Sequence, residues 1–228
     1  MDRQVITVPY AMLDSGTVDW WIDWRGQPGN DSTQGLTQTV FNAFPRWTGA
    51  TQLNLIKETA GQWRAIRWQS QGRVHTFRLF MIDPLVFNRA SVLSGSLATL
   101  GVPFSTGERF AGGYGFDPGL VVPAAADAAA GATVVDVTVT DAALVPVAGQ
   151  ILSANDWPFG VTSVTAQGGD VYRLTVQMPL REAITAGDSV SLVATGIFEA
   201  TEDGSGSTPY DANLLTQPTM QFREVLNR

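Results

Sequence analysis

The run V-D-W-W-I-D-W, from Val18 to Trp24, holds the two carboxylates whose spacing most resembles a catalytic pair. A glycosidase needs two carboxylates flanking a sugar, with aromatic side chains beneath it. Alternation along a strand places Asp19, Trp21 and Asp23 on one side, and it leaves the other side to Val18, Trp20, Ile22 and Trp24. The two carboxylates then lie roughly 13 Å apart at about 3.3 Å per residue, too far for either hydrolytic geometry. We interpret the run as a strand with one solvated face and one core face.

Metal and nucleophile chemistry find little support in the sequence. The chain has no cysteine and one histidine, His75, so the usual zinc sites and a Ser-His-Asp triad are not indicated. We expect His75 to be a packed or interface residue. Oxygen ligands for Ca²⁺ gather around a glycine-rich loop without the spacing of an EF-hand, at Glu199, Glu202, Asp203 and Asp211.

Two glycine-rich runs, Gly112–Gly115 and Gly204–Ser207, lack the lysine and the helix of a phosphate-binding loop. We interpret both as flexible loops. No residue is therefore assigned a catalytic, cofactor-binding or metal-binding role. We expect a protein that is not an enzyme and needs no cofactor.

Aromatic residues are unusually prominent, with seven tryptophans and eleven phenylalanines. The tryptophans could form a carbohydrate-binding platform, but aromatic residues also anchor cores and subunit interfaces. We favour core and interface packing for the seven, which are Trp20, Trp21, Trp24, Trp47, Trp63, Trp68 and Trp157.

The elements that must position these residues are organised around residues 61–88. Residues 61–70 have the composition of a short helix, with Trp63, Ile66 and Ser70 near one face. Gly72 supplies the helix stop, because glycine takes a left-handed cap without strain. The period then changes from 3.6 to 2 over residues 74–81, which predicts a strand that ends at Asp83-Pro84.

The remaining chain is rich in β-strand signals. The early strands are expected at Gln4–Pro9, Val18–Trp24, Thr37–Phe44 and Gln52–Lys57, and the late ones at Thr133–Thr140, Gln150–Ser153, Phe159–Thr165, Val171–Gln177 and Ser189–Ala194. We predict a mainly β protein with one short helix, built as a β-sandwich or split-barrel ring domain plus a smaller β module. The expected domains are residues 1–120, with the helix near 60–71 and a long loop at 84–119, then the module at 124–200, then a polar linker and strand-like tail at 201–228. The loop is read either as an arm between subunits or as a pair of short strands.

Charge narrows the classes of function. Charged residues make up 15% of the chain, which is low for a soluble monomer and suggests that other subunits cover part of the surface. Residues 1–118 carry a net charge of +1 and residues 119–228 a net charge of −8. No basic stripe for specific nucleic-acid binding is visible, although an acidic surface suits one past which DNA slides. Neither a signal peptide nor an apolar stretch of membrane-spanning length is evident, so we expect assembly in the cytoplasm without membrane insertion.

Two stretches resemble tail proteins of long-tailed bacteriophages and of phage-derived gene transfer agents. The first is W-R-A-I from Trp63, followed by G-R-V-H-T-F-R-L from Gly72 and by Asp83-Pro84. The second begins with G-Q-I-L-S at Gly149 and P-F-G-V-T-S-V at Pro158. It continues from Val171 as V-Y-R-L-T-V-Q-M-P-L-R-E-A-I-T-A-G-D-S-V-S-L and ends with G-I-F at Gly196. The order and spacing of these motifs carry the resemblance, which covers about half of the chain.

The resemblance implies a structural component of the tail tip, most similar to a distal tail protein. Such a protein is typically a hexameric ring that joins the tail tube to the hub and baseplate and encloses the DNA channel. The expected partners are copies of the chain, the tube protein and the hub or baseplate proteins, with the virion as the location. Three alternatives stay open: a receptor-binding or carbohydrate-binding tail module, a tail terminator, and a hub-associated protein.

Overall fold

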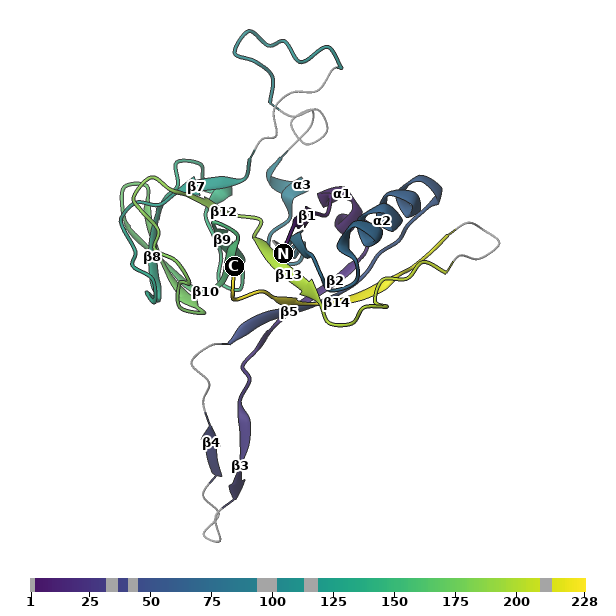
Figure 1. The fold of residues 1–228 in the computed structure, drawn as a ribbon. Coiled ribbons are helices and arrows are strands. Elements are labelled where there is room, and N and C mark those ends of the chain that lie inside the picture. The colour runs from purple at the N-terminus through teal and green to yellow at the C-terminus, as the bar shows by residue number, and fades with distance from the viewer. Residues whose placement is uncertain (1–2, 32–36, 41–44, 94–101, 113–118, 210–214) are drawn as a thin grey trace. The chain divides into compact units, whose positions relative to one another are not determined.

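The computed structural model describes residues 3–31, 37–40, 45–93, 102–112, 119–209 and 215–228. The chain divides into two compact units, one formed by residues 1–80 and 196–228 and the other by residues 81–195. Each unit is built around a six-stranded sheet (Figure 1). The prediction of a mainly β protein is therefore confirmed.

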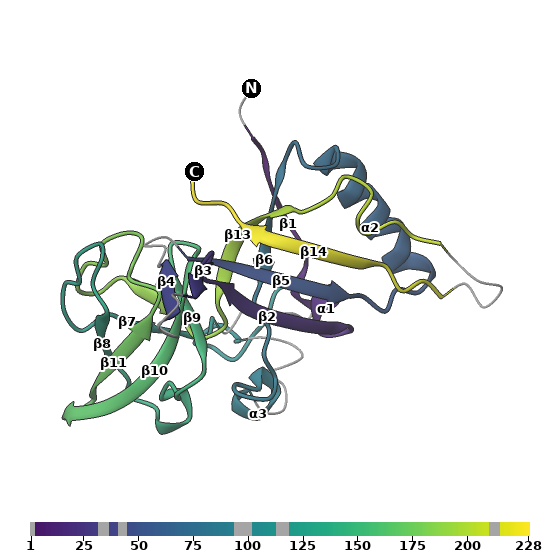
Figure 2. The same cartoon turned by 90° about the horizontal axis from the view of Figure 1, so that it is seen from below.

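The sheet of the first unit contains strands from both ends of the chain (Figure 2). In spatial order it runs β1 (Val5–Thr7), β6 (Thr76–Phe80), β13 (Thr195–Ala200), β14 (Thr219–Glu224), β5 (Arg46–Gln52) and β2 (Thr17–Asp23). β1 is parallel to β6, whereas β14 is antiparallel to both of its neighbours, and β2 is antiparallel to β5. The C-terminal strand is thus internal to the sheet.

Large side chains fill one face of this sheet because small residues lie opposite them. A Cβ added to Gly49 would meet the Trp20 ring at 2.3 Å, so the indole of β2 lies directly on the backbone of β5. The Trp20 and Phe198 rings are 5.1 Å apart, and the Phe77 and Phe222 rings are 5.8 Å apart with edge-to-face geometry. These contacts form the core of the first unit.

Helix α2 (Lys57–Ser70) is the one helix longer than five residues among the described elements. Its buried side chains are Trp63, Ile66 and Ser70, the face that the sequence predicted. The helix starts four residues earlier than expected, where the Thr59 Oγ1 accepts a hydrogen bond from the Ile56 N–H and so satisfies one backbone group at the helix start. At its other end Gln71 takes the left-handed cap conformation, one residue before the predicted Gly72.

Two early assignments need correction, and a third is confirmed where the chain is described. The fourth strand was expected at Gln52–Lys57, but β5 spans Arg46–Gln52. The strand lies earlier because Trp47, Gly49 and Thr51, which precede the expected start, alternate inward. β2 ends at Asp23, so Trp24 lies beyond it and is 47% exposed. In the expected strand Thr37–Phe44, residues 37–40 form β4 (Thr37–Val40), which pairs with β3 (Gln27–Asp31), and residues 41–44 lie outside the described chain.

Two short helices complete the described part of the N-terminal half. α1 (Tyr10–Asp14) follows β1 and buries Met12 and Leu13. α3 (Arg89–Val92) lies in the expected loop 84–119. In the same loop Phe104 donates its N–H to Glu108 O at 2.8 Å and stacks edge-to-face with Phe110. Residues 94–101 and 113–118 lie outside the description, and an intersubunit role for this loop stays a prediction.

The second unit contains the predicted late strands. Its sheet runs β7 (Val121–Pro123), β12 (Ser189–Ser191), β9 (Ile151–Ala154), β10 (Trp157–Gly168), β11 (Val171–Gln177) and β8 (Val134–Thr138), and a short 3-10 helix, η1, covers Ala142–Leu144. Gly168 and Gly169 form the hairpin turn between β10 and β11, both with positive φ. The edge strands meet at one isolated bridge, Ala124 to Val137, so the described strands form no closed barrel. The split-barrel detail stays a prediction.

The domain boundaries differ from those that the sequence predicted. The first domain was expected to end near residue 120, but residues 81–120 belong to the second unit, where Leu93 and Leu120 join its core. The strand-like end expected within 201–228 is confirmed: it returns to the first unit as β14, which bonds to two strands. Pairing between strands that are distant in sequence decides both boundaries.

No helix in the described part of the chain is long and apolar enough to cross a membrane.

Candidate functional site

The open face of the first unit's sheet gathers the polar side chains that the sequence singled out. Strand register places Asp19 opposite Ala50, and Ala50 opposite Gln221. The next row that points the same way comprises Trp21, Thr48, Arg223 and Glu199. Asp23 and Arg46 form the row beyond it. We call this surface the polar face; it contains Asp19, Trp21 and Asp23 together, as alternation predicted.

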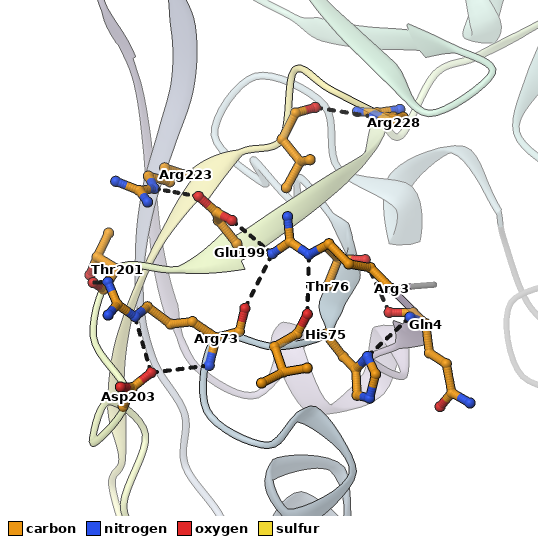
Figure 3. A network of polar contacts seen from close by, with 12 residues as sticks. Arg3, Gln4, Arg73, His75, Thr76, Glu199, Thr201, Asp203, Arg223 and Arg228 are labelled. Atoms are coloured by element: carbon orange, nitrogen blue, oxygen red, sulfur yellow. Dashed lines mark hydrogen bonds and ion pairs between the residues drawn. The ribbon is translucent and has the colours of Figure 1, made fainter. Parts of the chain in front are cut away.

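Ion pairs neutralise one end of the polar face (Figure 3). The Glu199 carboxylate accepts from Arg223 Nε at 2.7 Å and from Arg3 Nη2 at 2.8 Å. Arg3 is held in place because its guanidinium also donates to the backbone oxygens of Arg73 and Val74. Burial alone would raise the pKa of the Glu199 carboxyl, but the two arginines hold it below its usual value. Asp23 is likewise paired, with Arg46 Nε at 3.2 Å.

A second group of charges fixes the loop that follows β13. Asp203 accepts from Arg73 Nε at 3.0 Å and from the Arg73 backbone N–H at 3.2 Å. Arg67 of α2 donates to the Asp203 backbone oxygen at 2.7 Å. Burial lowers the pKa of Arg67, and the Asp203 charge opposes that effect. The loop is thereby tied to the C-terminal end of the helix.

These contacts argue against a calcium site at the four acidic residues named above. Two of the four candidate ligands, Glu199 and Asp203, already bind arginines, and Asp211 lies outside the described residues. Glu202 is exposed. Within the described ranges no three acidic or histidine side chains lie together in a way that could hold a metal ion.

The other residues singled out in the sequence have structural surroundings. His75 is 8% exposed and accepts a hydrogen bond at Nδ1 from Gln4 N–H, at 3.1 Å. Within Gly204–Ser207, interpreted above as a flexible loop, Gly206 N–H donates to Thr219 O and Gly206 O accepts from Trp63 Nε1 at 2.9 Å. That run is therefore a fixed turn packed against α2. In Gly112–Gly115 only Gly112 is described.

The tryptophans do not form one platform. Trp63 and Trp47 are buried, Trp20 is half-buried against Phe198, and Trp157 begins β10 in the second unit. The exposed ones are Trp21, Trp24 and Trp68, at 41%, 47% and 72%. Trp68 is on α2, whereas Trp21 lies on the polar face of β2. Core packing therefore accounts for part of the set, and Trp21 is the one that adjoins polar side chains on the sheet.

A groove of about 610 Å³ crosses the other end of the polar face. Strands β2, β5 and β14 form its floor, and the turn after β13 forms a wall. Sequence reasoning missed it, because alternation orders the faces within each strand but does not show which faces of β2, β5 and β14 lie together. The pairing of β14 with β5 could not be read from either strand.

Known proteins offer no further guide to the site. A scan against protein-family models finds no family that matches this chain, and a search of curated proteins finds no significant match. The resemblance to phage tail proteins consequently rests on the two quoted stretches alone.

Proposed function

We propose that this chain is a structural component of a bacteriophage tail tip, a ring that joins the tail tube to the tip and encloses the DNA channel. The observation that carries the proposal is that the two resembling stretches fold as connected structural elements. The first supplies the second half of α2 and all of β6, an internal strand of the first unit's sheet. The second supplies β9, β10, β11 and β12, most of the second unit's sheet.

An open sheet edge supports self-association. β2 is an edge strand in the described sheet, and it presents seven residues whose outer backbone groups face no strand among the described ones. Neither proline nor lysine, the residues that commonly protect such edges, occurs in it. In a closed ring, each subunit would contact the next one head to tail, and this contact would cover the β2 edge of every subunit.

The distribution of charge supports a channel that does not retain DNA. The second unit, residues 81–195, contains ten acidic and four basic residues, a net charge of −6. The first unit contains eleven acidic and ten basic residues, a net charge of −1. An acidic surface repels phosphates, so we place the second unit's carboxylates on the lumen of the assembled ring.

Assembly of the purified full-length chain tests the proposal. We expect native mass spectrometry to show a closed oligomer, a hexamer on the resemblance, and negative-stain images to show rings. Addition of the tail tube and hub proteins should give complexes in which the ring lies between them. A chain that stays monomeric at high concentration, and that is missing from mature particles, would refute the proposal.

A further inference from the structure

The groove on the polar face is a second feature, independent of ring assembly. Its floor is a cross-strand row in which Ala50 lies between Asp19 and Gln221. Because the alanine methyl is short, the floor dips between the two longer side chains. The turn 201–207 borders it, and that turn is held rigidly by the Asp203 and Gly206 contacts. The volume of about 610 Å³ lies within the range of small-molecule sites.

Four polar side chains that line the groove are uncommitted, whereas those of Thr201, Ser205 and Gln217 already make hydrogen bonds. No hydrogen bond to another described residue engages the side chains of Asp19, Gln52, Thr219 or Gln221. The paired charges at the other end of the same face, around Glu199, are already satisfied by arginines. The groove therefore offers both donors and acceptors to a ligand, without first breaking internal contacts.

The chemistry of the lining selects a class of ligand. The charged residues that line the groove are Asp19 and Glu202, both acidic, so phosphates and acidic polymers are repelled. Amides and hydroxyls, such as those of Gln52 and Thr219, pair well with sugar hydroxyls, which are also both donors and acceptors. Trp21, which is 41% exposed, lies just outside the groove, in the next row beyond Asp19 on the same face of β2. A sugar chain that extends past Asp19 would meet its apolar ring, which is of the kind that stacks on a pyranose.

We propose that this groove binds a neutral oligosaccharide, with the Asp19, Gln52 and Gln221 side chains bonding its hydroxyls and with Trp21 stacking on a sugar ring. Ala50 is the residue that keeps the groove open. A ring at the tail tip would in this way also contact neutral glycans, but the binding site lies within one chain and does not depend on assembly.

Calorimetric titration of the full-length protein tests the proposal, using maltohexaose, cellohexaose and mannohexaose as neutral probes. An acidic hexagalacturonate and a basic hexalysine peptide are titrated in parallel. We expect saturable binding of at least one neutral probe and no binding of the acidic one. Ala50→Phe should fill the groove and weaken binding at least tenfold, whereas Gln221→Ala should weaken it about fivefold through loss of one hydrogen bond.

Trp68→Ala is the matched control, because that exposed indole lies on α2 and does not line the groove. It should leave the affinity unchanged, whereas Trp21→Ala should lower it, and circular dichroism should show that all variants remain folded. Binding of hexalysine alone would assign the groove to basic peptides and overturn the proposal. If none of the neutral probes bound, the proposal would be overturned. It would be overturned as well if the Ala50→Phe and Gln221→Ala variants bound a neutral probe with the affinity of the wild-type protein.

Discussion

Phe222 offers the sharpest test of the fold, because the sequence predicts only a strand-like tail there and the structure makes it part of a buried core. The side chain is 1% exposed and lies edge-to-face with Phe77. Its cross-strand neighbours are Gly49 and Ala200, which are too small to expand into a vacated space. Phe222→Ala should therefore lower the free energy of unfolding by about 3–5 kcal/mol, toward the upper end of that range.

Urea denaturation of the wild-type and variant proteins measures this loss directly. For a chain of this length the thermal midpoint should also fall by about 2–4 °C for each kcal/mol. Gln221→Ala is the matched control on the same strand, because its side chain is exposed, and its effect should stay within about 0.5 kcal/mol. A loss below about 1 kcal/mol for Phe222→Ala would show that the C-terminal run is not an internal strand.

The other predictions concern charge and glycine. The pKa of Glu199 is depressed in the folded protein, so its contribution to stability is present above the ordinary glutamate pKa of about 4.3 and is lost as the pH falls through the lower folded value. Glu199→Gln should therefore lower stability at pH 7 by about 1 kcal/mol and flatten the acid limb of a stability-against-pH profile; an unchanged profile would contradict the arginine pairing. Gly49→Ala should be strongly destabilising in chemical denaturation, since its Cβ would fall 2.3 Å from the Trp20 ring. Gly61→Ala should instead raise stability by about 0.5–1 kcal/mol, because the residue lies inside α2 with open space around it, and a loss there would show that the helix is wrongly placed.

Local patterns predicted the elements that depend on near neighbours. The change of period after Gly72 indicated a helix followed by a strand, and the structure contains α2 and β6 at those positions. The turn at Gly168-Gly169 is local in the same way, since glycines adopt positive φ without strain. The alternation that places Asp19 and Trp21 on one face also needs only the period of a strand.

Features that join distant residues escaped prediction. The groove depends on Gln221 lying beside Ala50, and the core of the first unit depends on Phe222 lying opposite Gly49. In each case the residues are more than 150 positions apart, so neither stretch contains a signal for the other. Glu199, a candidate calcium ligand in the sequence, is paired with Arg223, 24 positions away, and with Arg3, 196 positions away.

The sequence by itself determined the mainly β fold class, the main helix and the strands of the second unit. It could do so because hydrophobic periodicity and turn residues act over a few neighbouring positions. Only the tertiary structure decided where the units divide, which carboxylates are neutralised and where a groove opens. Those outcomes follow from strand pairing between the two ends of the chain, whose register is set by the packing of whole faces and not by any one segment.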